Sequence, residues 1–320
     1  MPGSSEISWW PAPAKLNLFL HVTERYPDGY HALQTLFQLI DLCDRIGIAV
    51  REDGRIERRA GLAQVEPERD LVVRAARLLQ RHCRTRLGAD IHVVKRIPAG
   101  GGLGGGSSDA ATVLLALNRL WRAELDLATL AELGLSLGAD VPVFVRGQSA
   151  WGEGRGERLT AVQLPPRWYL VIHPGVPVST AEVFQAPELT RNCPLITIHD
   201  FLAAMTGAYS AAAAFGGVSA AVDGTAAAEV VPDVANVCEP VVRARHPAIA
   251  QALDWLSAQI DARGRPVRAR MSGTGSCIFA DFERWQEAER IAARVPERWS
   301  SFVARGLDAS PLHGLLGPAS

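Results

Sequence analysis

A run rich in glycine is the part of this sequence best suited to binding an anion. Six glycines fall within positions 100–106 and two serines follow, in the order Pro98, Ala99, Gly100, Gly101, Gly102, Leu103, Gly104, Gly105, Gly106, Ser107 and Ser108. Glycine accepts positive φ angles and lets other groups approach the backbone closely. Free amide N–H groups in such a loop can surround a phosphate, and a helix starting behind it adds the positive end of its dipole. The run therefore predicts a phosphate-binding loop.

Other motifs built on glycine fit this run less well. A P-loop has a lysine directly after its last glycine, and Ser107 stands there instead. Gly100, Gly102 and Gly105 satisfy G-x-G-x-x-G, but a Rossmann loop follows the first strand of a βαβ unit, and this run lies far into the chain. The apolar segments on either side disfavour a flexible linker. The P-loop is excluded, and the dinucleotide-binding and linker interpretations stay as alternatives.

Two polar positions inside apolar segments are candidates for a reactive site. Residues 13–22 alternate in character, so Lys15 and Asn17 share one face of a strand with Phe19, while leucines take the other face. The simpler interpretation is that this face meets solvent. The aromatic Phe19 on the same face favours a half-covered cleft instead. Asp140 has apolar neighbours on both sides, and a carboxylate buried there needs a partner such as a lysine. Its alternative role is to cap the next element.

The segments around these residues indicate a mixture of strands and helices. Strands are predicted at residues 13–22, 45–50, 56–59, 90–97, 167–173 and 302–304. Helices are predicted at residues 70–82, 110–121, 127–137, 247–262 and 285–295. Gly138 is expected to end the helix at 127–137. Asp109 is expected in the first turn of the helix after the glycine run, where the helix dipole favours a carboxylate.

Length and proline content indicate two domains. A chain of 320 residues is long for one domain, and Pro165 and Pro166 precede a new strand. We therefore predict domains at residues 1–164 and 165–320. Residues 203–231 shift to an alanine-rich composition, and no function is assigned to them.

Charge and cysteine content narrow the functional classes. A net charge of -1 gives no general attraction for nucleic acid, and no apolar run is long enough for a membrane span. The five cysteines are widely spaced without a C-x-x-C pair, which argues against a disulfide framework or a zinc site. The chain also opens with polar residues instead of a signal peptide. We expect a cytoplasmic protein that acts on small molecules, as a monomer or a weak homodimer.

Four segments in a fixed order carry a resemblance to a known family. They are P-A-K-L-N-L from position 13, the glycine run, L-G-A-D-V-P-V-F-V from position 137 and S-G-T-G-S-C-I-F from position 272. Together they resemble the GHMP small-molecule kinases. D-G-Y-H at 28–31, H-P-G-V at 173–176 and S-P-L-H at 310–313 are similar to the members that phosphorylate a cytidine diphosphate-linked methylerythritol. The resemblance spans residues 11–313.

The resemblance implies a fold and a reaction. The fold is α+β, with an N-terminal domain like domain 2 of ribosomal protein S5, a ferredoxin-like C-terminal domain and a catalytic cleft between them. The reaction is ATP-dependent phosphorylation of the 2-hydroxyl of the methylerythritol unit, in the non-mevalonate route to isopentenyl diphosphate. Mg²⁺ is expected to accompany the ATP phosphates, and the sequence shows no carboxylate cluster that marks a metal site.

The resemblance also assigns roles to residues. Residues 98–108 match the loop that wraps the ATP phosphates, and Lys15 and Asp140 match the catalytic pair. The positions that match substrate-holding residues are Asn17, Tyr30, His31, Thr180 and Phe184. Tyr30 and Phe184 offer two aromatic faces for a cytosine. The alternatives are a GHMP kinase for homoserine, mevalonate or a sugar, and a nucleotide-binding module without catalytic activity.

Overall fold

One mixed sheet runs through the described part of the protein. The structure is a computed structural model that describes residues 6–61, 65–206 and 235–317. Within these residues, seven strands of a 10-stranded sheet follow the order β3-β4-β2-β10-β7-β9-β8, while β1 and β5 also pair with β2, and β6 pairs with β5. The strands are β1 (Ser8–Arg25), β2 (His31–Arg51), β3 (Ile56–Ala60), β4 (Gly88–Val94), β5 (Ala150–Glu153), β6 (Arg158–Ala161), β7 (Trp168–His173), β8 (Arg270–Met271), β9 (Ile278–Phe282) and β10 (Ser300–Leu307).

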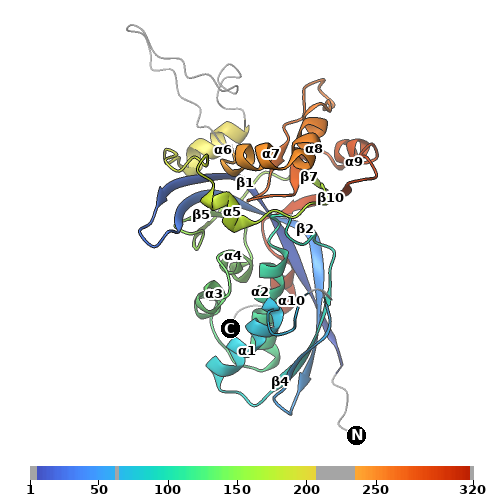
Figure 1. Cartoon of the computed structure of the whole chain (residues 1–320). Helices are drawn as coiled ribbons and strands as arrows, with labels where there is room; N and C mark the ends of the chain where they lie inside the picture. Colours follow the sequence, from blue (N-terminus) through green and yellow to red (C-terminus); the bar gives the residue numbers. More distant parts are fainter. Residues whose placement is uncertain (1–5, 62–64, 207–234, 318–320) are drawn as a thin grey trace.

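The helices form two groups along this sheet. They are α1 (Leu71–Cys83), α2 (Gly105–Leu120), α3 (Leu127–Leu135), α4 (Val141–Arg146), α5 (Thr180–Gln185), α6 (Ile198–Thr206), α7 (Cys238–Arg245), α8 (Pro247–Ser257), α9 (Trp285–Ala292) and α10 (Pro311–Leu316). Figure 1 shows α1, α2, α3 and α10 gathered in the lower part of the view and α6–α9 in the upper part. No helix in the described ranges has the length and apolar character needed to cross a membrane.

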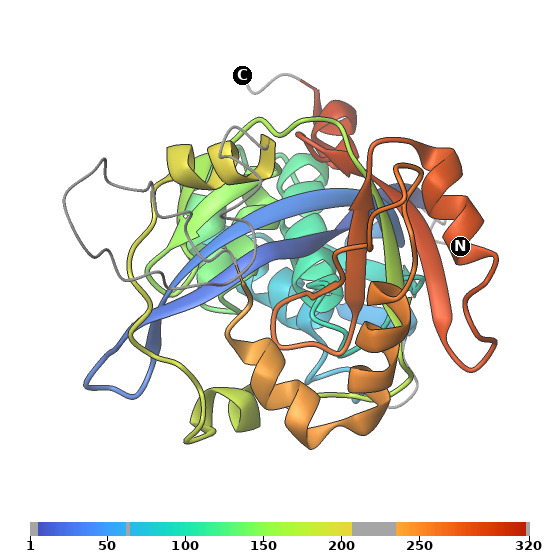
Figure 2. The same ribbon diagram turned by 90° about the horizontal axis from the view of Figure 1, so that it is seen from above.

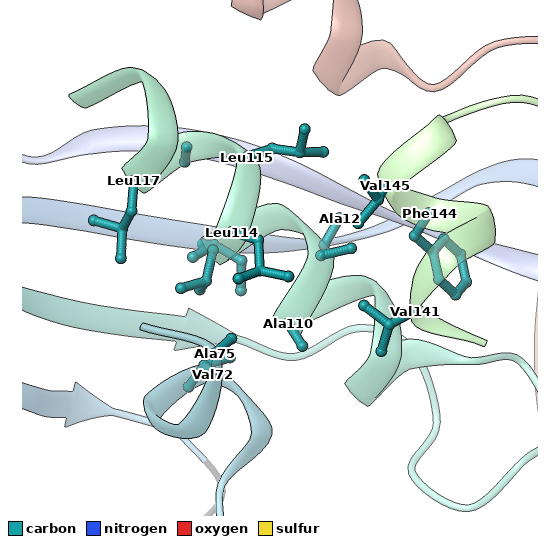
Figure 3. Close-up of a cluster of buried hydrophobic side chains, with 14 of the residues drawn as sticks. Ala12, Val72, Ala75, Ala110, Leu114, Leu115, Leu117, Val141, Phe144 and Val145 are labelled. Carbon is teal, nitrogen blue, oxygen red and sulfur yellow. The ribbon is translucent and has the colours of Figure 1, made fainter. Parts of the chain in front are cut away.

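The helix behind the glycine run is the centre of the lower core. Its side chains Ala110 and Leu114 are fully buried, and they pack in one cluster with Val72 of α1 and Phe144 of α4. Figure 3 shows these side chains meeting around α2, with Ala12 arriving from β1. Because α2 is packed on several sides, the loop that leads into it has a rigid base.

Strands β1 and β2 form a long antiparallel hairpin that extends past the core. The register pairs Lys15 with Leu39 near its middle and Arg25 with His31 beside its turn. Figure 2 shows the tip of this hairpin projecting from one edge of the molecule. Both faces of its central part are buried, with Leu18 at 1% exposure on one face and Asn17 at 3% on the other. The expectation of a half-covered or solvent-facing strand was therefore wrong, because elements far along the chain cover its polar face.

The sheet continues across the predicted domain boundary. Gly306 and Leu307 of β10 pair with Ile40 and Leu39 of β2, and the rest of β10 pairs with β7. The amide of Gln38 donates to the carbonyl of Leu307 at 2.9 Å, and its oxygen accepts from the hydroxyl of Tyr169 at 3.2 Å. These contacts join the two halves of the chain, and the boundary itself stays a prediction.

Several element boundaries differ from the predictions. β1 begins at Ser8 and not at residue 13, and α8 ends at Ser257 and not at 262. α3 ends at Leu135 with Ser136 as its cap, so Gly138 does not end this helix. The prediction for α1 was close, since Asp70 caps it by accepting the N–H of Val72. Most of the alanine-rich segment 203–231 lies outside the described residues.

Candidate active site

The glycine loop requires glycine for two physical reasons. Gly100, Gly102 and Gly104 have φ angles of 68°, 74° and 71°, in the left-handed region that side chains disfavour. A Cβ on Gly102 would lie 2.2 Å from the carbonyl oxygen of Ser272. Gly104 is the N-cap of α2, so the loop ends where the free N–H groups of this helix begin. This geometry suits an anion in front of α2.

A pocket of about 360 Å³ opens beside this loop. Every residue from Pro98 to Ser107 lines it, together with Lys95 and with Leu71 at the start of α1. Ser108 does not line it, because this residue is fully buried. The pocket combines backbone amides, a lysine and apolar side chains, which suits a nucleotide with its phosphates on the loop.

The side chain of Lys15 contacts both the glycine loop and Asp140. This side chain is only 3% exposed, so its ammonium group needs protein partners. Its Nζ donates to the side-chain oxygen of Asn17 and, at 3.0 Å, to the carbonyl of Gly102 in the loop. It also lies 3.3 Å from a carboxylate oxygen of Asp140. A cation from β1 is thereby fixed between the phosphate loop and an aspartate.

Asp140 pairs with a lysine and makes no capping bond. It stands at the N-cap position of α4, yet its side chain forms no hydrogen bond with the helix backbone. Its partner is Lys15, as expected for a carboxylate with apolar neighbours, and 35% of the Asp140 side chain stays exposed. A carboxylate that is held by a lysine and stays open to a ligand is placed as a candidate proton acceptor.

The second glycine turn supports this centre from the C-terminal half. The hydroxyl of Ser272 donates to the carbonyl of Gly102 at 3.0 Å and accepts the backbone N–H of Asn17 at 3.1 Å. Asn17 is buried and also donates to Thr35 at 2.9 Å, so its amide orients Lys15. The exposed Thr180 shares a 2.9 Å hydrogen bond with Thr274 of the turn.

Two of the predicted base-binding residues stack on each other. The rings of His31 and Phe184 lie with centroids 5.3 Å apart and planes inclined by 26°. Tyr30 is 60% exposed, and the guanidinium of Arg155 lies 4.2 Å from the centre of its ring. Arg155 also pairs with Asp28 in the same turn. The structure thus brings His31 and Phe184 together and places Tyr30 against an arginine from the β5–β6 turn.

A buried charge cluster lies next to the loop, and no sequence motif predicted it. Lys95 pairs with Asp44 and, at 2.8 Å, with Asp109. Asp109 is 4% exposed and bonded to this lysine. The prediction that it lies in the first turn of the helix was wrong, because α2 begins at Gly105 and has no acidic residue in its first turn. Burial raises the pKa of Asp109 to about 7, Lys95 opposes this rise and Asp44 adds to it. Burial lowers the pKa of Lys95, but the two carboxylates outweigh it and the net shift is upward.

Some functional neighbours were missed because their signals are weak in one sequence. Lys95 stands at an ordinary solvent-facing position of a predicted strand, just before the glycine run. Ser272 and Thr35 contact Asn17 across 255 and 18 positions of the chain, and such long-range contacts leave no local sequence signal. The position of Lys95, three residues before the predicted phosphate loop, is the one signal that could have pointed to it.

Comparison with known families agrees with this geometry. Residues 70–148 match the family described as GHMP kinases N terminal domain, and residues 220–301 match GHMP kinases C terminal. The first match contains the glycine loop and Asp140. The expected α+β fold of GHMP kinases is confirmed by these matches and by the arrangement of the described elements.

Individual relatives are similar over nearly their whole length. The 4-diphosphocytidyl-2-C-methyl-D-erythritol kinase of Halorhodospira halophila is 54% identical over 99% of both chains, and that of Alkalilimnicola ehrlichii is 51% identical over 97% of this chain and 96% of its own. A crystal structure of 4-(cytidine 5'-diphospho)-2C-methyl-D-erythritol kinase is 33% identical, with a TM-score of 0.73 over 94% of this chain and 100% of that one. The chain therefore belongs to the 4-diphosphocytidyl-2-C-methyl-D-erythritol kinase family of the GHMP kinases.

Proposed function

We propose that this protein transfers the γ-phosphoryl group of ATP to the 2-hydroxyl of 4-diphosphocytidyl-2-C-methyl-D-erythritol. The observation that carries the proposal is the position of Lys15, which contacts the phosphate loop and Asp140 at once. This places a donor-binding loop and a proton acceptor around one cation. The relatives of known name supply the identity of the acceptor substrate.

The transfer step needs positioning and charge stabilisation more than covalent chemistry. The transition state of phosphoryl transfer is loose, with negative charge spread over the phosphoryl oxygens. The amides of residues 98–108 hold the phosphates of ATP, and Lys15 stabilises the negative charge that develops between donor and acceptor. Asp140 accepts the proton of the 2-hydroxyl. The hydroxyl oxygen of the substrate then bonds to the γ-phosphorus, and ADP leaves.

The acceptor is held by the second set of residues. His31 and Phe184, with Tyr30 nearby in sequence, present aromatic groups suited to a cytosine. Thr180 is exposed beside Thr274 and offers a hydroxyl to the sugar or the diphosphate. Asn17 is buried against Lys15, so we assign it the orientation of that lysine next to the reacting hydroxyl.

Magnesium fits this site only as a companion of the ATP phosphates. No group of three or more metal-ligating side chains occurs among the described residues, and Asp109 and Asp140 are each engaged by a lysine. Ser107 lines the pocket and can contribute a hydroxyl, whereas Ser108 is buried. Mg²⁺ retains water and binds readily to phosphate oxygens, and when bound it neutralises part of their charge.

We propose that the protein is cytoplasmic and that it is a monomer or a weak homodimer. All five cysteines are free thiols, which supports a reducing compartment such as the cytoplasm. Analytical ultracentrifugation tests the expected monomer or weak homodimer.

The deciding experiment measures ADP production by the purified protein. With MgATP, we expect ADP to form only when 4-diphosphocytidyl-2-C-methyl-D-erythritol is added, and ³¹P NMR should show a new phosphomonoester on the 2-hydroxyl. Homoserine, mevalonate and galactose should give no ADP. Turnover of one of these alcohols in place of the cytidine substrate would identify another GHMP kinase, and ATP binding without any turnover would identify a module without catalytic activity.

A further inference from the structure

Arg191, in the segment after α5, connects the two stacked rings of the base site. Its Nη2 donates to the carbonyl oxygens of Phe184 at 2.9 Å and Ala186 at 2.7 Å. Its Nη1 donates to the carbonyl of Leu189 at 3.1 Å. Its Nε donates to Nε2 of His31 at 3.2 Å. One guanidinium group thus fixes the backbone that carries Phe184 and the imidazole that stacks on it.

The contact with His31 determines where the imidazole carries its proton. A guanidinium group has only donors, so the nitrogen that it contacts must be an acceptor. A neutral imidazole whose Nε2 accepts carries its single proton on Nδ1. His31 is therefore held as a neutral ring with an Nδ1–H donor.

The charges that face His31 act in the same direction. Burial lowers the pKa of His31, and the positive charges of Arg191 and of Arg25, its partner across the hairpin, lower it further. Phe184 supplies an uncharged face. Protonation of Nε2 would also place an N–H against the N–H of Arg191. Geometry and charge together keep the ring neutral around pH 7.

We propose that Arg191 is a positioning residue for the nucleotide substrate, because it holds His31 in the Nδ1–H tautomer and fixes Phe184 against it. An N–H donor at this place suits an acceptor atom on the edge of a pyrimidine base, such as O2 of cytosine. The proposal rests on the proposed function, since His31 and Phe184 must face the cytidine group. Arg191 itself acts through these two residues.

The tautomer can be measured on the wild-type protein without ligand. Long-range ¹H–¹⁵N spectra distinguish a protonated Nδ1 from a protonated Nε2, and the spectrum of His31→Asn assigns the signal among the eight histidines. We expect the Nδ1–H form for His31 at pH 7.5. The Nε2–H form would overturn the proposal, whatever the enzyme turns over.

Substitution of Arg191 gives a second readout. In Arg191→Gln we expect cytidine diphosphate to bind roughly tenfold or more weakly at pH 8, because hydrogen bonds from a charged donor are lost. Arg191→Lys should recover part of the loss. The matched control is Arg245→Gln, which removes an exposed arginine that pairs with Glu188 and does not contact His31. Calorimetry measures the dissociation constants, and thermal unfolding and ATP binding verify that each variant is folded.

The pH profile separates positioning from a general structural effect. Without Arg191, the neutral ring can place its proton on either nitrogen, and only protonation below about pH 6.5 restores a hydrogen on Nδ1 in every molecule. The ratio of the dissociation constants of Arg191→Gln and wild type should therefore shrink between pH 8 and pH 5.5. A ratio that is constant with pH, or equal to that of Arg245→Gln, would contradict the proposal. If wild-type protein fails to bind cytidine diphosphate, the proposed function fails while the tautomer result stands.

Discussion

A buried lysine is costly unless every direction around its ammonium group offers an acceptor or an anion. Lys15 meets this requirement with the Asn17 amide oxygen, the Gly102 carbonyl and the Asp140 carboxylate. The same contacts that make its burial tolerable hold it beside the phosphate loop. At the scale of the residue, the contacts that stabilise the buried Lys15 are the same contacts that its proposed catalytic role requires.

Asp140→Asn tests the proton acceptor. The amide keeps the shape of the side chain but cannot take a proton, so we expect kcat to fall by about 10²–10⁴ while KM for ATP changes little. Steady-state assays of ADP formation measure both constants. Asp126→Asn is the matched control, because the exposed Asp126 only caps α3 and asparagine caps equally well. Near-normal turnover of Asp140→Asn would leave this residue a structural role alone.

Asp109 should make stability depend on pH in an unusual direction. Its pKa is 3.8 in an unfolded chain and about 7 in the folded protein, so folding takes up a proton between these values. The folded state binds more protons, and the free energy of unfolding therefore decreases as pH rises through this window. Asp109→Asn removes the effect. Denaturant unfolding of both proteins from pH 4 to pH 8 should show the wild type losing stability relative to the variant, and a constant difference would contradict the assignment.

At the scale of the element, the glycine loop is shaped from outside as much as by its own sequence. Its alternate glycines adopt the left-handed conformation, while the Ser272 carbonyl and the Phe144 ring close in on Gly102 and Gly104. The N-terminus of α2 then follows with free amides. We therefore expect these contacts to preform the loop as a cradle.

Gly102→Ala tests this preformed cradle. A Cβ there would meet the Ser272 carbonyl oxygen at 2.2 Å and would stand on a backbone with positive φ. We expect a loss of at least about 1–3 kcal/mol of stability from strain, together with weaker ATP binding. Gly106→Ala is the comparison, since its nearest neighbour is 3.5 Å away and alanine favours the helix, so its melting temperature should stay equal or rise. Equal melting temperatures for the two variants would show that the loop adapts.

Sequence patterns predicted elements where the information is local. The glycine run lies between an apolar strand and an apolar helix, and both are present as β4 and α2. The alternation of residues 13–22 predicted a strand and placed Lys15 beside Asn17 correctly. It did not predict that this face is buried, because its cover includes Ser272, more than 250 positions away. Alternation identifies the two faces of a strand, but only the complete fold decides which of them meets water.

Hydrophobic periodicity also could not reveal the partners of single charged residues. Lys95 resembles any surface lysine of a strand until the chain folds Asp44 and Asp109 around it. Arg191 lies in a stretch without regular structure, and its hydrogen bonds go to backbone carbonyls that carry no sequence signal. Sequence motifs thus predicted candidates for the reacting groups, and the structure was needed to find the groups that contact and orient them.

At the scale of the whole molecule, a small polar joint connects the N-terminal and C-terminal strands. The amide of Gln38 contacts Leu307 and Tyr169, and Ser149 donates to the Leu307 carbonyl at 2.7 Å. The side chains of Gln38, Ser149 and Tyr169 are all buried. Because β2 also carries the hairpin, this joint fixes the C-terminal half relative to Lys15.

Gln38→Leu should loosen this joint. The substitution leaves the Tyr169 hydroxyl buried without its acceptor, at a cost of about 1–3 kcal/mol, while the Leu307 carbonyl keeps its hydrogen bond from Ser149. Tyr169→Phe in the same background removes this orphaned hydroxyl and should restore part of the loss. Urea unfolding measures the three stabilities. A double variant no more stable than Gln38→Leu alone would mean that the hydroxyl finds another partner.

The hairpin of β1 and β2 has a consequence for which molecules the enzyme accepts. It carries Lys15 near its middle and His31 at the end of the ribbon, so one hydrogen-bonded ladder connects the proposed site of phosphoryl transfer with the proposed base site. The register of this ladder shifts between Asn17 and Leu20 and between Val22 and Glu24, and pairing continues on both sides of each shift. We therefore expect an acceptor whose cytidine and alcohol are joined through a single phosphate to be a poorer substrate than one joined through a diphosphate.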